Sequence, residues 1–326
     1  VYFTSGGTES DNWALQGIAF SRKDKGKHII TTNVEHNAVI RSLRRLKSDG
    51  FTVTSLSVDD KGRVNPRDVA EAVTKDTILI SVMHSNNETG TIQPVEEIAR
   101  IAREKKIIFH IDAVDSVGIV PFDVKAIGAD LVSFASNTFY GPTGVGGLYV
   151  RRGVKIFPIF DGGVQENNKR AGTENLLGII GMGTAAEIAQ RDIHTRYAYL
   201  KGLKDKFLRE LPTVLDEILI NTHPVHSLPH LVSASIKYVE GESVMLMLDD
   251  EGFGVSTRSA CATGSLRASH VLLSIGLSHE DAQGTLVIAF GVDNTPEDVS
   301  RFLKSLKTVV TTLRDISPLY KKAAVK

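Results

Sequence analysis

The sequence predicts an α/β protein in which a mostly parallel sheet is covered by helices on both faces. Short apolar runs recur along the chain, and several are followed by a turn and then by a helical pattern. Such alternation is typical of parallel strands joined by crossover helices. A chain of 326 residues with 42% hydrophobic residues can bury a large core, and its length suggests about two domains.

The elements of the first half follow from the period of the apolar residues. Predicted strands lie at residues 28–34, 52–58, 77–85, 107–112, 129–136 and 146–150. Helical spacing with charged outer faces predicts helices at residues 11–21, 37–46 and 95–105. Helical patterns then dominate residues 173–211.

A smaller α+β domain is expected after this helical stretch. Beyond the His- and Pro-rich segment 222–230, the pattern predicts strands at 232–238 and 286–290 and helices at 243–251 and from residue 296. We therefore expect a large domain at residues 1–204 and a small domain at residues 205–326 that carries the loop around Cys261.

Composition argues against several classes of partner. Lys and Arg total 38, and Asp and Glu also total 38. The chain therefore has no overall electrostatic field that would attract nucleic acid or an anionic membrane. No apolar run could span a bilayer and no signal-peptide pattern is present, so we expect no membrane partner. A single cysteine excludes an internal disulfide and suggests the cytoplasm. The chain opens inside an expected strand, so a preceding segment is expected to be absent.

Ligands of parallel sheets bind at the carboxyl ends of the strands, so these ends are the candidate sites. At the first, 4-TSGGTESD-11, two glycines lead into a helix whose free N–H groups could bind a phosphate. The alternative is an ordinary helix cap made by Thr8 and Asp11. At the next two, His36 offers a flat ring that could stack on a ligand, and Asn86 and Asn87 offer donors. A surface histidine and turn-forming asparagines are the alternatives.

Asp112 ends an apolar strand, where a buried carboxylate needs a cation or a donor as its partner. A protonated pyridine nitrogen would meet that need. So would a metal, because His110 alternates with Asp112 onto the same face, and His84 and His36 could complete the ligands. The metal ranks lower because no metal-motif spacing is present.

Cys261 lies in 256-STRSACATGS-265, among small residues that predict a partly exposed loop. A lone cysteine is most often a small buried hydrophobe. Near the cationic Arg258 and Arg267, however, this thiol could be a nucleophile.

Taken together, these stretches resemble the NifS/IscS cysteine desulfurases of the class V aminotransferases. The resemblance covers nearly the whole chain and is carried by 4-TSGGTESDN-12, Glu35-His36, 84-HSNNETG-90, 110-HIDAVDSVG-118, 139-FYGPTGVGGLYVRRG-153, 170-RAGTEN-175, 240-EGES-243, 259-SACATGSL-266 and 316-ISPLY-320. It implies the fold type I of pyridoxal-phosphate (PLP) enzymes, with a seven-stranded type of mostly parallel sheet.

The resemblance also implies roles for individual residues. Gly7 and Thr8 would hold the cofactor phosphate, and His36 would stack on the ring. Asn87 would lie near the phenolic oxygen of the cofactor. Asp112 would pair with the ring nitrogen and stabilise the electron sink.

Two further roles imply partners. Thr173 would reach the phosphate of a neighbouring subunit, which implies a homodimer with shared sites. Cys261 would attack the sulfur of the substrate, L-cysteine, and carry it as a persulfide. Relatives of this kind pass that sulfur to an iron–sulfur scaffold protein or another acceptor.

The departures from the family pattern lie at residues that carry out the chemistry in the family. Where the family reads S-x-H-K-x-Y-G-P-K-G, this chain has Ala135, Asn137, Thr138 and Thr143. Thr138 stands in the place of the Schiff-base lysine. Threonine has no amine with which to anchor PLP or move the α-proton of the substrate.

Two other departures concern the cofactor oxygen and the substrate. Asp115 stands where the family has a glutamine that donates to the phenolic oxygen. Val287 stands where the family has an arginine that forks onto the substrate carboxylate.

Three functions remain open at this point. The first is a desulfurase-like enzyme of iron–sulfur cluster assembly. The second is a non-catalytic dimeric homologue, a partner-binding scaffold in which Cys261 accepts sulfur or ligates a cluster. The third is a metal site at His110, Asp112 and Asp115.

Overall fold

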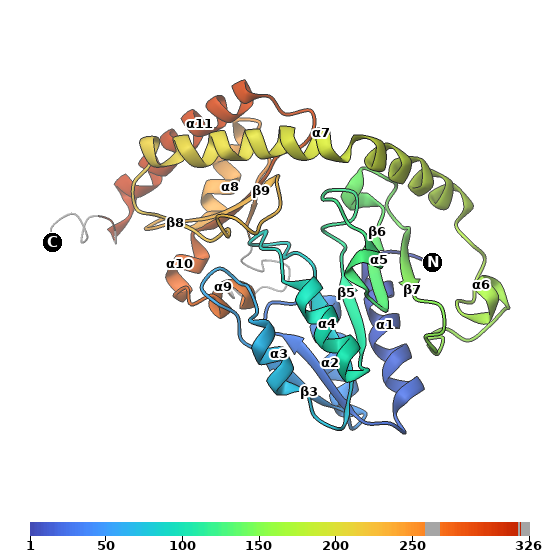
Figure 1. The fold of residues 1–326 in the computed structure, drawn as a ribbon. Coiled ribbons are helices and arrows are strands. Elements are labelled where there is room, and N and C mark those ends of the chain that lie inside the picture. The colour runs from blue at the N-terminus through green and yellow to red at the C-terminus, as the bar shows by residue number, and fades with distance from the viewer. Residues whose placement is uncertain (258–267, 319, 321–326) are drawn as a thin grey trace. The chain divides into compact units, whose positions relative to one another are not determined.

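The computed structural model describes residues 1–257, 268–318 and 320. The chain forms two compact units, which are described separately (Figure 1). The first unit comprises Val1–Asp59, Arg63–Asn87 and Ile92–His194, and the second comprises Asp60–Gly62, Glu88–Thr91 and Thr195–Lys326. The division after His194 and the expected boundary after residue 204 both fall within helix α7 (Leu176–Val214).

A seven-stranded sheet forms the centre of the first unit. Its strands are β1 (Tyr2–Thr4), β2 (His28–Thr32), β3 (Thr52–Leu56), β4 (Thr77–Met83), β5 (Ile108–Asp112), β6 (Leu131–Ala135) and β7 (Gly146–Val150). Their order is β1-β7-β6-β5-β4-β2-β3. All pairs are parallel except those of β7, which runs antiparallel to both β1 and β6. The predicted α/β class with a mostly parallel sheet is confirmed.

Helices cover both faces of this sheet. Successive residues of a strand point to opposite faces, so each strand packs against helices on both sides. The helices of this unit are α1 (Gly7–Arg22), α2 (Asn37–Ser48), α3 (Pro66–Ala72), α4 (Val95–Lys105), α5 (Val124–Ile127), the 3-10 helix η1 (Asn137–Phe139), α6 (Gln165–Asn168) and the first part of α7. Leu79 of β4 packs with apolar residues of α1 and α2, whereas the next residue, Ile80, packs with those of α3 and α4. The strands are therefore apolar on both faces, as a covered parallel sheet requires.

Helix α7 is long enough to span a bilayer but not apolar enough. It has 39 residues, nearly twice the roughly 20 that a membrane span needs. Charged side chains such as Lys201 and Asp205 recur along it. Within the part of the chain that the structure describes, no helix combines the length and the hydropathy of a membrane span.

The second unit is an antiparallel sheet packed against helices. Its strands are β8 (Ile218–Ile220), β9 (Leu231–Ile236), β10 (Ser256–Thr257) and β11 (Thr285–Ala289), in the order β10-β11-β9-β8. Its helices are the second part of α7, α8 (Gly241–Asp250), α9 (His270–Ser274), α10 (His279–Gln283) and α11 (Pro296–Ile316). Helix α11 starts at Pro296, as the sequence predicts. Thr295 precedes it as the N-cap and forms a reciprocal capping box with Asp298.

A buried lysine joins α7 to the loop before β9 within the second unit. The Nζ atom of Lys204, on a side chain that is 6% exposed, donates to Oγ of Ser227 at 2.7 Å and to the carbonyl of Leu228 at 2.7 Å. Burial lowers the pKa of Lys204 to about 8, because an ammonium group loses hydration there. The two hydrogen bonds partly replace that hydration.

Candidate functional site

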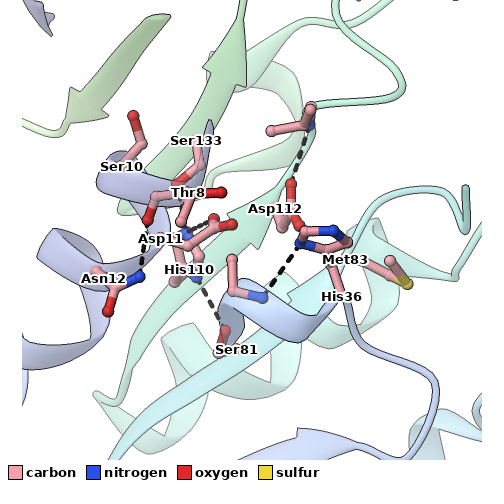
Figure 2. Close-up of polar contacts among 12 residues, drawn as sticks. Thr8, Ser10, Asp11, Asn12, His36, Ser81, Met83, His110, Asp112 and Ser133 are labelled. Carbon is pink, nitrogen blue, oxygen red and sulfur yellow. Dashed lines mark hydrogen bonds and ion pairs between the residues drawn. The ribbon is translucent and has the colours of Figure 1, made fainter. Parts of the chain in front are cut away.

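The candidate residues of the first unit gather at one edge of its sheet. Strands β1, β2, β4, β5 and β6 run in one direction, so their carboxyl ends meet there. The residues that end or follow these strands are Gly7, Thr8, His36, Asn87, Asp112 and Thr138. Figure 2 shows Thr8, His36 and Asp112 in this region.

The start of α1 has no side-chain cap. Its N-cap is Gly6, with φ 152°, and no side chain accepts the first N–H groups of the helix. The cap expected from Thr8 and Asp11 is therefore not formed, since Thr8 is exposed and Asp11 is buried. A Cβ at Gly7 would lie 2.4 Å from Cγ2 of Val114, so a side chain there would force Val114 to move. A helix start left open in this way suits an anion.

Asp112 is a buried carboxylate at the end of β5. Its side chain is 5% exposed, and its Oδ1 atom accepts the N–H of Val114 at 3.0 Å (Figure 2). Burial raises the pKa of Asp112 to about 6, since desolvation outweighs the hydrogen bond. The group is therefore ionised at neutral pH and suits a cationic partner.

His110 lies two residues before Asp112 and is held by serines on the neighbouring strands. Its Nδ1 atom is 2.9 Å from Oγ of Ser81 on β4, and its Nε2 atom is 2.9 Å from Oγ of Ser133 on β6. Burial lowers the pKa of His110 to about 3, so the ring is neutral.

The hydrogen bonds of His110 do not favour the metal alternative. Both ring nitrogens that could ligate a metal already contact hydroxyl groups. Among the described residues, no group of three or more histidine, cysteine or acidic side chains is placed to hold a metal ion. Asp115 is half-buried beyond the end of β5.

Asp11 of α1 lies against this histidine. Its Oδ1 atom is 3.7 Å from Nε2 of His110, and its side chain is 1% exposed (Figure 2). Burial, and then the charge of Asp112, raise the pKa of Asp11 well above its ordinary value. The ring of His110 is neutral, so its contact with Asp11 is not an ion pair.

Glu35 is a third buried acid, beside the candidate stacking residue His36. The hydroxyl of Thr32 donates to Oε1 of Glu35 at 2.6 Å, and the N–H of Met83 donates to both carboxyl oxygens at 3.2 and 3.0 Å. Burial raises the pKa of Glu35 to about 8. His36 itself is exposed and caps α2, with Nδ1 accepting the N–H of Ala38 at 3.2 Å. The hydrogen bonds of Glu35 thus hold in place the turn between β2 and α2, which carries His36.

In the loop after β6, the side chain of Thr138 is hydrogen-bonded to the backbone. Ala135 is the last residue of β6, and Asn137 and Thr138 lie in η1. The Oγ1 atom of Thr138 donates to the carbonyl of Ala135 at 2.9 Å. This hydrogen bond satisfies the hydroxyl locally.

The remaining candidates lie in several places. Asn87 is half-buried after β4, and Thr173 is exposed between α6 and α7. Val287 is buried in β11 of the second unit. Cys261, together with Arg258 and Arg267, lies outside the described residues.

The buried position of Asp11 was not predicted from the sequence, although the spacing of apolar residues in α1 indicates it. Asp11, Leu15 and Ile18 follow the i, i+4, i+7 pattern of one helix face, and all three are buried. An acid in line with core residues implies a buried carboxyl. The serine pair around His110 had no such signal, because serines occur throughout strands.

Comparison with known proteins gives the same family for both sequence and structure. The class-V aminotransferase family matches residues 1–302. The cysteine desulfurase IscS of Methanosarcina thermophila is 48% identical over 319 residues, which is 98% of this chain and 79% of that protein. The cysteine desulfurase IscS of Dictyoglomus turgidum is 49% identical over 98% of this chain and 81% of that protein.

A solved structure of a NifS-like protein has the same fold. It superposes with a TM-score of 0.89 at 36% identity and covers 95% of this chain and 82% of that chain. The expectation of a fold type I PLP enzyme is confirmed by this similarity. The chain therefore belongs to the class-V aminotransferase family and is a homologue of the IscS cysteine desulfurases within it.

Proposed function

We propose that this protein is a cysteine desulfurase-like protein that binds PLP without a covalent anchor. L-cysteine is its amino-acid ligand, and the thiol of Cys261 receives the sulfur. The observation that carries the proposal is the buried, ionised Asp112 at the carboxyl edge of the sheet, at the same edge as the open start of α1.

The residues present fit PLP at three points. The uncapped N–H groups at Gly7 and the hydroxyl of Thr8 suit its phosphate. The exposed ring of His36 suits the face of its pyridine ring, and Asp112 suits the protonated ring nitrogen. When bound, PLP supplies an electron sink for the bonds at the substrate α-carbon.

No covalent anchor is proposed at the loop after β6. Thr138 stands where the family lysine is expected, and its hydroxyl is bound to the carbonyl of Ala135. A hydroxyl cannot accept or deliver the α-proton of the substrate near neutral pH. Asn137 and Asp115 would likewise replace family donors, and an ionised Asp115 would repel the phenolic oxygen of the cofactor.

Substrate binding is expected to be weak. Val287, in the proposed place of the arginine fork, offers no charge to the carboxylate of L-cysteine. Loss of such a charged hydrogen-bond pair costs about 2–5 kcal/mol of binding free energy.

A homodimer and a sulfur acceptor complete the proposal. Thr173 is exposed and could contact the phosphate bound by a second copy. Leu176, Leu177 and Ile180, which follow it at the start of α7, are 66%, 85% and 67% exposed and could pack against that copy. The sulfur held by Cys261 would pass to an iron–sulfur scaffold protein or another acceptor.

A second candidate is a non-catalytic dimeric scaffold, in which Cys261 accepts sulfur from another protein or ligates a cluster. The hydrogen bond between Thr138 and Ala135 favours it, because the side chain is satisfied by its own loop. PLP binding separates the two candidates, since a scaffold does not need the cofactor.

The test is an absorbance titration of the protein with PLP, followed by borohydride reduction and intact mass measurement. The proposal expects a saturable spectral change without a covalent adduct in the natural chain. The Thr138→Lys variant should gain the mass of one reduced PLP per chain. No saturable change in the natural chain would favour the scaffold instead.

Sulfide release from L-cysteine then tests the reaction. The Thr138→Lys, Val287→Arg double variant should release sulfide at least tenfold faster than the natural chain. Cys261→Ser in that background should abolish the transfer of sulfur to an acceptor. If the double variant binds PLP covalently but releases no sulfide, the desulfurase assignment is wrong.

A further inference from the structure

We infer that the first unit carries an anion site at the edge of its sheet opposite to the candidate cofactor site, where Arg103, Lys125 and Arg151 bind the phosphate group of a small phosphate monoester. The inference goes beyond the proposed function and does not rest on it, because none of these residues belongs to the candidate cofactor site.

The site is a cavity beside the amino-terminal ends of β5 and β6. Its volume is about 360 Å³, within the usual range of small-molecule sites. Arg103 lies in the last turn of α4, the helix before β5, and Gly128 lies just before β6. Because β7 runs antiparallel to β6, Tyr149 and Arg151 at its carboxyl end reach the same edge. Asp112 ends β5 at the other edge, so the two sites are separate.

Arg103 lies with its guanidinium against the backbone of Gly128. A Cβ at Gly128 would be 2.0 Å from Nη2 of Arg103, so a side chain there would displace the guanidinium. The φ of Gly128 is 83°, which glycine adopts without steric cost. In the part of the chain that the structure describes, no hydrogen bond or ion pair engages the side chain of Arg103. The dipole of α4 favours a cation in its last turn, but it accounts for neither the cavity nor the glycine.

Two more cations line the cavity, and nearby acids offset their charge only in part. Lys125 is exposed in α5, where its acidic neighbour is Asp123, the N-cap of that helix. The Nε atom of Arg151 donates to Oδ1 of Asp130 at 2.7 Å, but the Arg151 side chain remains 58% exposed. None of the described residues that line the cavity is acidic. The cavity therefore has a positive potential that attracts anions.

Tyr149 adds a neutral donor to this cavity. Its side chain is half-buried and packs against the core on the α3 and α4 face of the sheet. Its hydroxyl has no hydrogen-bond partner among the described residues, although a tyrosine in such a position usually finds one. The hydroxyl can therefore donate to a ligand that enters the cavity.

These groups match the chemistry of a phosphate monoester. Such a group carries a charge of about −1.5 to −2 near neutral pH and has three acceptor oxygens. The guanidinium of Arg103 can fork onto two of these oxygens, and the Lys125 ammonium and the Tyr149 hydroxyl can donate to them as well. Val124 and Ala129, which also line the cavity, offer apolar contacts to the ester group.

The test follows the backbone N–H signals of the isotope-labelled full chain by NMR while phenyl phosphate is added. The signals of Gly128 and Arg151 should shift and then saturate. The signals of Gly7 and Thr8 report separately on binding at the start of α1, so the two sites are distinguished in one titration.

Variants then identify the groups that bind. Arg103→Met and Lys125→Met should each raise the dissociation constant measured at Gly128 about tenfold, because each removes a charged partner of the phosphate. Tyr149→Phe should raise it about threefold, since a neutral hydrogen bond is lost. Arg44→Met is the matched control and should leave the constant unchanged. Arg44 is an exposed arginine of α2, which packs on the other face of the sheet.

Three outcomes would contradict the inference. The site is absent if Gly128 does not shift, and the named cations do not form it if folded Arg103→Met and Lys125→Met bind as tightly as the natural chain. If malonate, a dicarboxylate, binds with the same dissociation constant as phenyl phosphate, the assignment to phosphate monoesters is wrong. Circular dichroism on each variant establishes that it is folded.

Discussion

The Nε2 atom of His110 lies 3.7 Å from Oδ1 of Asp11; the pKa of His110 is lowered to about 3, and that of Asp11 is raised well above its ordinary value. Both are buried, and desolvation disfavours the imidazolium and the carboxylate alike. Glu35, with a pKa of about 8, is mostly protonated at neutral pH. Asp112, with a pKa of about 6, is mostly ionised at neutral pH. The nearby His110 and Glu35 are polar groups that are mostly neutral at that pH.

Replacing Glu35 should change how stability depends on pH. The pKa of Glu35 is raised from 4.5 to about 8, so the folded state keeps a proton that the unfolded state loses. Its contribution is complete below pH 4.5 and falls by up to about 1.4 kcal/mol per pH unit until pH 8. Glu35→Gln should remove this fall, as measured by urea unfolding at pH 5, 6, 7 and 8. Glu97→Gln, at an exposed position of α4, is the control, and an equal slope in both variants would contradict the expectation.

His110→Ala should destabilise the first unit strongly. The change opens a cavity and leaves the hydroxyls of Ser81 and Ser133 without their ring partner. The free energy of unfolding should fall by about 2–4 kcal/mol. Urea unfolding at pH 7 measures this loss. His194→Ala, on the exposed side of α7, should stay within about 0.5 kcal/mol of the natural chain.

Lys204→Met should flatten the alkaline branch of the stability curve. The pKa of Lys204 falls from 10.5 in the unfolded state to about 8 in the folded state. The unfolded state therefore binds more protons between pH 8 and 10.5, and stability rises with pH across that window. The variant lacks this rise, which thermal unfolding at several alkaline pH values would detect. Lys201→Met tests an exposed lysine on the same helix, and a rise preserved in Lys204→Met would refute the assignment.

Leu177→Asp should weaken the proposed dimer. Leu177 is 85% exposed, so the substitution leaves the folded chain intact, whereas a charge buried in the dimer contact would be costly. Sedimentation should show the dimer dissociation constant rising by at least a hundredfold, or about 2.7 kcal/mol. Val225→Asp, at another exposed apolar position, is the control. Unchanged association of Leu177→Asp would place the dimer contact elsewhere.

The fold was largely predictable because strands and helices differ in apolar period. Helix α4 has the expected bounds, since its apolar positions repeat clearly from Val95. Helix α1 begins at Gly7, earlier than the expected residue 11, because its uncapped glycine start carries no apolar signal. Strand β10, with two residues, is too short to show a period.

The candidate residues at the strand ends were predictable, but the contacts between segments far apart in the chain were not. Asp112 was found because an acid that ends an apolar run is conspicuous. The contact of Asp11 with His110 joins a helix to a distant strand, and a single sequence carries no record of such a pair. The ion pair between Glu9 and Arg170 likewise joins residues that are far apart in the chain.

Glu166 has a consequence for how copies of this chain avoid aggregation. Strand β1 is the outermost strand of the described sheet, and outer strands with open N–H groups can recruit a strand from another molecule. The side chain of Glu166 accepts the N–H of Phe3 and brings a negative charge beside it. Strand addition at this margin would have to displace that carboxylate. The carboxylate of Glu166 thus protects the outer margin of β1 against the addition of a further strand.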